Sequence, residues 1–225
     1  MSESIGPQLR VAAIFVFIGF IMTLGMTAGI LANPEGSQFH QVIDPADIIT
    51  DLSTATSADI QMRLAGIVFD SFFIVGYIAI FYGLFMLVKE KDPFFPKLAF
   101  ILGLTTGVCD LTENAMHVAL YNGIPSGWIP EGSYFASLWS FTFTKDLTSY
   151  MAGMIFIVLL LLTLSEIPEI KVAKLILTIL VVAYVGLGSI AVVIPSVLLL
   201  RNLSFMIDML VGSILLYRIS RQVES

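Results

Sequence analysis

The sequence predicts an all-α, polytopic integral membrane protein with six transmembrane helices in one bundle. Hydrophobic residues make up 57% of its 225 residues and charged residues only 12%, whereas a soluble domain has about 25% charged residues. Such a chain cannot cover a water-exposed surface with polar groups, so lipid must cover much of it. The formal net charge of −6 excludes nucleic acid as an expected partner, because binding to phosphates needs a basic patch.

Six stretches of the chain are long and apolar enough to cross a bilayer, which takes about 20 residues per helix. We interpret residues 1–225 as a single six-helix transmembrane domain of a multi-pass protein in the cell membrane. The first stretch is too long for the core of a signal peptide, so we expect it to be retained as a span. The predicted spans are about residues 10–32, 62–88, 97–122, 137–164, 172–194 and 196–218.

The distribution of lysine and arginine between the connecting segments predicts the orientation. Cytoplasmic segments of membrane proteins carry an excess of these residues. With both termini placed in the cytoplasm, Arg63 is the one basic residue in an external connection, and Lys145 and Arg201 fall within spans. The basic residues then on the cytoplasmic side are Arg10, Lys89, Lys91, Lys97, Lys171, Lys174, Arg218 and Arg221.

The long connection over residues 33–61 predicts a turn at its start, in residues 33–36, and a short helix further on. Asp44 suits the N-cap of that helix, Pro45 its first position and Asp47 its first turn. We expect this helix on the outer surface, with an apolar face made by Ile48, Ile49 and Leu52. It is either a lid over an outward opening or a linker that rests on the bundle, and we favour the linker.

Ionisable residues within the predicted spans are the most informative feature of the sequence. Each would cost about 2.5–3.5 kcal/mol if it faced lipid, so these side chains must face the bundle interior or water. By the rise of a helix, they lie between the membrane mid-plane and the outer surface. The sequence therefore predicts an outward-facing polar pocket. Its candidate residues are Asp70, Asp110, Glu113, Asn114, His117, Lys145, Asp146, Arg201 and Asp208.

The third span carries the clearest pattern within this set. Its residues Gly103, Gly107, Asp110, Asn114, His117 and Tyr121 follow one another at three- or four-residue steps, which places them along one helix face. Glycines four residues apart let another helix approach closely. Gly103 and Gly107, and likewise Gly25 and Gly29 of the first span, are therefore candidate contacts for a second copy of the chain or a membrane partner.

The charges in the spans do not balance, because five carboxyl groups stand against Lys145 and Arg201. Protonated carboxyls, a bound cation or a charged His117 could each supply the missing positive charge. A divalent metal held by Asp110, Glu113 and His117 is one form of the cation hypothesis; the sequence does not identify a cofactor otherwise. Alternatively, Arg201 with Asp208, and Lys145 with one carboxylate, are structural pairs.

Three classes of function remain open at this point. The leading hypothesis is a binding or transport protein whose pocket takes a cation, protons or a small ligand. The second is an intramembrane enzyme that performs acid–base or metal-dependent chemistry on a lipid-like substrate. The third is a non-catalytic subunit or sensor in which the polar network only fixes the packing of the helices.

Overall fold

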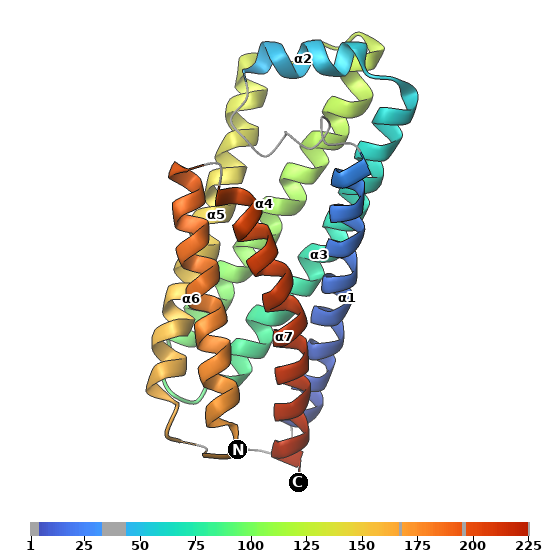
Figure 1. Cartoon of the computed structure of the whole chain (residues 1–225). Helices are drawn as coiled ribbons and strands as arrows, with labels where there is room; N and C mark the ends of the chain where they lie inside the picture. Colours follow the sequence, from blue (N-terminus) through green and yellow to red (C-terminus); the bar gives the residue numbers. More distant parts are fainter. Residues whose placement is uncertain (1–4, 33–43, 167, 195–196, 225) are drawn as a thin grey trace.

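A computed structural model of the chain describes residues 5–32, 44–166, 168–194 and 197–224, and every regular element in these ranges is a helix (Figure 1). Six of the described helices are long and apolar enough to cross a membrane, which agrees with the six predicted spans. They are α1 (Ile5–Ala32), α3 (Ser57–Val88), α4 (Phe95–Gly123), α5 (Gly132–Leu162), α6 (Lys171–Val193) and α7 (Leu198–Glu224). Shorter elements are α2 (Pro45–Thr54) and the 3₁₀ turns η2 (Ile124–Ser126) and η3 (Pro168–Ile170).

Several helices begin at residues whose side chains bond the free backbone N–H groups of the first turn. Asp44 accepts a hydrogen bond from the N–H of Ala46 at 2.8 Å at the start of α2, as the sequence predicts. Thr56 and Asp59 form a reciprocal capping box at the start of α3. Before α4, Asp92 accepts hydrogen bonds from the N–H groups of Phe95 and Phe94, which lower the pKa of its carboxyl group. The predicted turn at residues 33–36 and the first residue of the last predicted span, 196, lie outside the described residues.

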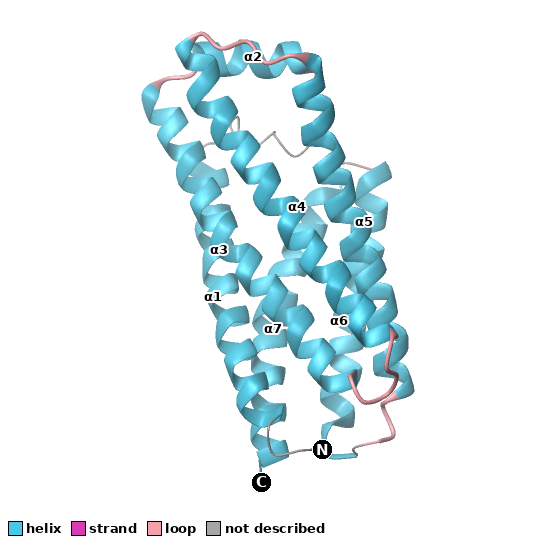
Figure 2. Cartoon of the chain, turned by 180° about the vertical axis from the view of Figure 1, so that it is seen from behind, coloured by secondary structure: helices cyan, strands magenta, loops and turns pink. Residues whose placement is uncertain are grey.

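The six long helices form a closed ring in chain order. Each packs against the helices before and after it in the sequence, and α7 returns to pack against α1. Figure 2 shows the same arrangement from behind, with α1, α3 and α7 on one side of the bundle. The start of α1 and the end of α7 lie together, because Arg10 forms an ion pair with Glu224. The ring therefore has one end that carries both termini and an opposite end that carries α2.

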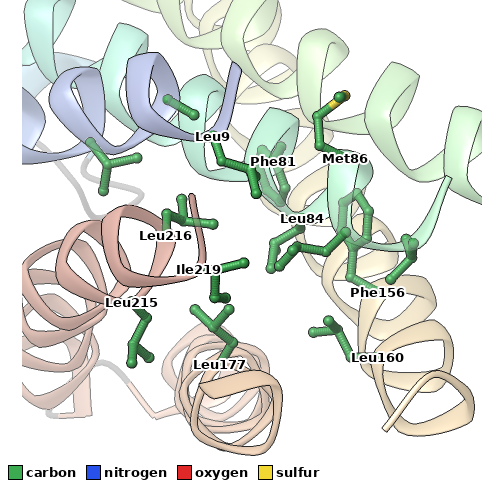
Figure 3. Close-up of a cluster of buried hydrophobic side chains, with 14 of the residues drawn as sticks. Leu9, Phe81, Leu84, Met86, Phe156, Leu160, Leu177, Leu215, Leu216 and Ile219 are labelled. Atoms are coloured by element: carbon green, nitrogen blue, oxygen red, sulfur yellow. The ribbon is translucent and has the colours of Figure 1, made fainter. Parts of the chain in front are cut away.

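The interior of the ring toward the termini is filled by apolar side chains, which we call the packed core (Figure 3). Phe81 of α3 stacks on Phe156 of α5 at a centroid distance of 6.1 Å, and Leu84 and Leu160 are buried beside them. In lipid this packing stabilises the bundle by van der Waals contact, since lipid tails are as apolar as the side chains.

Close approach of two helix backbones supports this half of the ring. A Cβ atom added to Gly76 of α3 would lie 2.6 Å from the Cα of Gly19 in α1. The glycines of the third predicted span also form contacts within the chain. Gly103 lies against the Phe81 side chain and Gly107 against that of Ile78. The small-residue face on α4 thus serves the contact with α3.

The helix α2 lies across the end of the bundle remote from the termini (Figure 1). Its Ile48 and Leu52 are buried in a second apolar group, the end cluster, with Leu120, Tyr121, Ile124, Phe135 and Leu138 of α4, η2 and α5. This packing is what the linker interpretation of the short helix expects. The side of the membrane on which α2 lies remains a prediction from the lysine and arginine distribution.

Candidate functional site

A cavity of about 620 Å³ lies inside the ring, and we call it the polar cavity. It shares Tyr77 and Phe81 with the packed core and Tyr121 with the end cluster, so it lies between these two apolar groups. Each helix of the ring contributes to its wall. The ionisable lining residues other than tyrosine are Arg63, Asp70, Asp110, Glu113, His117, Lys145, Asp146 and Arg201.

Eight of the nine candidate residues named from the sequence line this cavity, and Asp208 does not. The face of α4 accounts for half of the eight: Asp110, Glu113, Asn114 and His117 are all buried. The ring of His117 stacks on Tyr121, the next residue of the predicted stripe, at a centroid distance of 5.9 Å. The helical spacing in the third span therefore identified a real buried face.

Lys145 of α5 is the centre of the polar network. Its Nζ lies 2.5 Å from Oε2 of Glu113 and 3.0 Å from Oδ1 of Asp110. The other oxygen of Asp110, Oδ2, accepts a hydrogen bond from the hydroxyl of Tyr77 at 2.9 Å. The sequence suggests a pair between Lys145 and one carboxylate, whereas the structure has one ammonium group shared by two. The network joins α3, α4 and α5.

Asp70 of α3 has a different environment from the other acids of the cavity. Its Oδ2 accepts a hydrogen bond from the amide Nδ2 of Asn114 at 2.7 Å. Within the described residues, no lysine, arginine or histidine nitrogen forms an ion pair with it, whereas Asp110, Glu113 and Asp146 each have a basic partner. Asp70 thus faces the cavity with a neutral partner only.

Arg201, in the first turn of α7, lies 3.9 Å from Asp146 of α5. The alternative pair of Arg201 with Asp208 is not formed. Seven residues separate those two positions, which places them two turns apart along the helix, and α5 brings Asp146 closer. Arg201 also donates hydrogen bonds to the side-chain oxygen of Asn202 at 3.2 Å.

Arg63 is a further cavity residue, which the sequence places in an external connection. In the structure it lies in the second turn of α3 and lines the cavity. Its side chain is 8% exposed and donates a hydrogen bond to Asp51 of α2 at 2.7 Å. The cavity wall therefore carries four carboxyl groups and the basic side chains of Arg63, Lys145 and Arg201, of which Arg63 is paired with an acid outside the wall.

Tyr184 of α6 is a second residue that no sequence signal singled out. Its hydroxyl is hydrogen-bonded to Ser149 of α5, and its ring packs edge-on against Phe205 of α7 at 4.8 Å. A lone tyrosine in an apolar span gives no indication of which neighbours it meets, so only the tertiary structure reveals this contact.

The metal hypothesis gains no support from the geometry. Among the described residues, no three histidine, cysteine, aspartate or glutamate side chains are grouped so that they could hold a metal ion. The ammonium group of Lys145 lies between Asp110 and Glu113. It supplies the positive charge at the place where a cation shared by these carboxylates would have to bind.

Asp208 lies in α7 and lines a separate, smaller cavity of about 40 Å³, which we call the inner cavity. Tyr77, Phe81, Tyr184 and Phe205 line both cavities and separate Asp208 from the polar cavity.

No protein-family model, curated protein or solved structure matches the chain.

Proposed function

We propose that this membrane protein binds a small organic molecule with a cationic group in the polar cavity, with Asp70 as the counter-ion, in a binding or transport role. The observation that carries the proposal is the environment of Asp70. This acid faces a large cavity with an amide as its hydrogen-bond partner, whereas each of the other acids of the cavity has Lys145 or Arg201 as a basic partner.

The free energy of an unpaired charge favours a cationic ligand at this position. A buried carboxylate without a positive partner is costly, and a ligand cation removes that cost while it forms a charge-assisted hydrogen bond. The ligand then offsets part of the excess negative charge of the cavity wall. The same argument disfavours an anionic ligand, which would add to the four carboxyl groups of the wall.

The volume of the cavity favours an organic molecule over a bare metal ion. About 620 Å³ falls within the range of about 300–1,000 Å³ that is typical of small-molecule sites. Aromatic rings adjoin the acid: Phe73, three residues along α3 from Asp70, packs edge-on against Tyr77 at 5.4 Å and Phe205 at 5.2 Å. Such rings can hold the apolar part of a ligand and attract its cation through their faces.

The network around Lys145 has a structural part in this proposal. Its bonds link α3, α4 and α5 and leave both carboxylates satisfied, so it can fix the shape of the cavity without binding the ligand. The proposal also keeps the expected orientation, in which the cavity is reached from the non-cytoplasmic side.

The test is a binding screen on purified protein in lipid nanodiscs. Primary, tertiary and quaternary organic ammonium ions are titrated by calorimetry, each beside a neutral compound of the same shape. We expect at least one cation to bind, its neutral analogue to bind at least tenfold more weakly, and Asp70→Asn to abolish the preference for the cation.

The matched control is Glu166→Gln, which removes an exposed carboxylate at the opposite end of the bundle, where it pairs with Lys91. This variant should bind as the wild type does. Equal affinity of cation and neutral analogue for the wild type, or an unchanged preference in Asp70→Asn, would refute the role of Asp70. If no ammonium ion binds at any concentration tested, the proposed function fails.

A further inference from the structure

Asp208 has no evident structural use among the residues that the structure describes. It is 8% exposed, and its Oδ1 has no hydrogen-bond partner among them. The inner cavity beside it is otherwise lined by apolar and aromatic side chains, including Leu177, Val181 and Met209. An acid in such a place must have a reason to be tolerated, since an aliphatic side chain would pack there at lower cost.

The protonated form of the carboxyl group is the one that suits this cavity. An ionised carboxylate without a partner in an apolar interior has a high free energy, and such a group usually binds a proton and becomes neutral. No basic side chain of the described residues lines the inner cavity. The titratable groups that face it besides Asp208 are Tyr77 from α3 and Tyr184 from α6, and neither supplies positive charge.

The inner cavity has room for water next to the acid. A water molecule needs about 10–15 Å³ of accessible space and polar partners, and the cavity offers about 40 Å³. Water there could take a proton from the carboxyl oxygen or return one to it, so that an O–H bond of Asp208 breaks as one of the water forms.

Four aromatic residues, Tyr77, Phe81, Tyr184 and Phe205, form the partition between the two cavities. Phe205 packs edge-on against both tyrosines, at 6.4 Å and 4.8 Å. The tyrosine hydroxyls bond Asp110 and Ser149, which line the polar cavity. A movement of these rings would connect Asp208 with the polar network, and none of the four partition residues is an acid or a base of the Asp, Glu, Lys, Arg or His type.

We infer that Asp208 is a proton-binding site, in which a carboxyl group carries an exchangeable proton behind the aromatic partition. As a consequence that rests on the proposed function, occupancy of this site by a proton is coupled to ligand binding in the polar cavity. The protein would then exchange a proton for, or bind it together with, an organic cation.

Infrared spectroscopy of the protein in lipid films tests the protonation directly. At neutral pH we expect a carbonyl stretching band of a protonated carboxyl group, shifted in heavy water and lost in Asp208→Asn. A band that persists in Asp208→Asn and vanishes in Asp70→Asn would assign the proton to Asp70 and overturn the inference, as would the absence of any such band.

A second variant covers the case in which Asp208→Asn fails to fold. Asp208→Leu should resist unfolding by sodium dodecyl sulfate at least as well as the wild type, because a protonated, unpartnered acid contributes no charge pair. A marked loss of resistance would instead indicate an ionised, partnered carboxylate and contradict the proposal.

The coupling has its own readout, the pH dependence of ligand affinity. In the wild type the affinity for an organic ammonium ion should change with pH, and in Asp208→Leu this dependence should be lost while binding persists. If affinity depends on pH equally in both proteins, the coupling is wrong although Asp208 can still hold a proton. If no ligand binds while the infrared band is present, the proposed function fails and the proton site stands.

Discussion

The two halves of the ring are built from the same six helices and have opposite interiors. Toward the termini, the packed core fills the space with interdigitating side chains such as Leu84, Phe156 and Leu216 (Figure 3). Toward α2, polar side chains from the same helices surround a cavity of about 620 Å³. The comparison indicates a division of labour: the tightly packed half holds the helices in place, so that the other half can keep an open site.

The forces that stabilise the two halves also differ. In a bilayer, moving an apolar side chain from lipid into the protein interior lowers the free energy little, so the packed core depends on close van der Waals contact. The polar half depends on charge-assisted hydrogen bonds in a medium of low dielectric constant, where each bond is strong and each unpaired group is costly. Mutations in the two halves should therefore destabilise the protein for different reasons.

The largest effect is expected from Lys145→Met, which removes the ammonium group shared by Asp110 and Glu113. Two buried carboxyl groups then lose their partner, and we expect a loss of about 3–5 kcal/mol in the free energy of unfolding. Unfolding by sodium dodecyl sulfate, followed by circular dichroism, measures this loss.

A triple variant separates lost charge pairing from lost packing. Lys145→Met combined with Asp110→Asn and Glu113→Gln removes the uncompensated charges, so it should recover most of the stability. If the triple variant is as unstable as the single one, the polar half is held by the shape of Lys145 and the contrast between the halves breaks down.

An intermediate effect on the free energy of unfolding is expected from replacing one phenylalanine by alanine in each half of the bundle. Phe156→Ala leaves a void in the packed core, where the side chain is fully buried. It should cost about 2–3 kcal/mol, less than the about 3–5 kcal/mol of soluble cores, because lipid removes most of the transfer contribution. Phe73→Ala only enlarges an existing cavity, so we expect about 1 kcal/mol or less. The same detergent titration compares the two; equal losses would indicate that the polar half is packed as tightly as the core.

The smallest global effect is expected from Asp51→Asn, which breaks the ion pair between α2 and Arg63. Because Asp51 is half exposed, the loss should stay below about 1 kcal/mol. Hydrogen exchange should nevertheless become faster in α2 alone. Glu166→Gln, which breaks an exposed pair at the other end, should leave exchange in α2 unchanged. Exchange that stays slow in Asp51→Asn would mean that Ile48 and Leu52 alone hold the helix.

Much of the fold could be predicted because lipid imposes strong constraints on a sequence. Span length follows from bilayer thickness, and intramembrane charges must turn inward whatever the details of packing. The buried face of α4 is confirmed for this reason, and the start of α2 at Asp44 is confirmed because aspartate is a favourable N-cap residue. Both depend on local spacing, which the chain displays directly.

The partners of each charged group could not be predicted, because they depend on helix rotation and on the depth at which helices cross. Asp208 belongs to the same helix face as Arg201, yet the aromatic partition separates it from the polar cavity. Arg63 lies near the end of a predicted span, where composition cannot distinguish a residue of a connecting loop from a helical residue that lines a cavity. The contact between Gly19 and Gly76 involves one glycine from each helix and so leaves no repeated motif.

The closed ring has a consequence for how the chain is made. Neighbours in the ring are neighbours in the sequence. Each helix can therefore pack against the preceding helix as the chain leaves the ribosome, and among the contacts between ring neighbours only that between α7 and α1 joins helices that are distant in the sequence. Only α1 lacks one of its two flanking helices until α7 is inserted. Until then, the flank of α1 that later packs against α7 stays open to lipid.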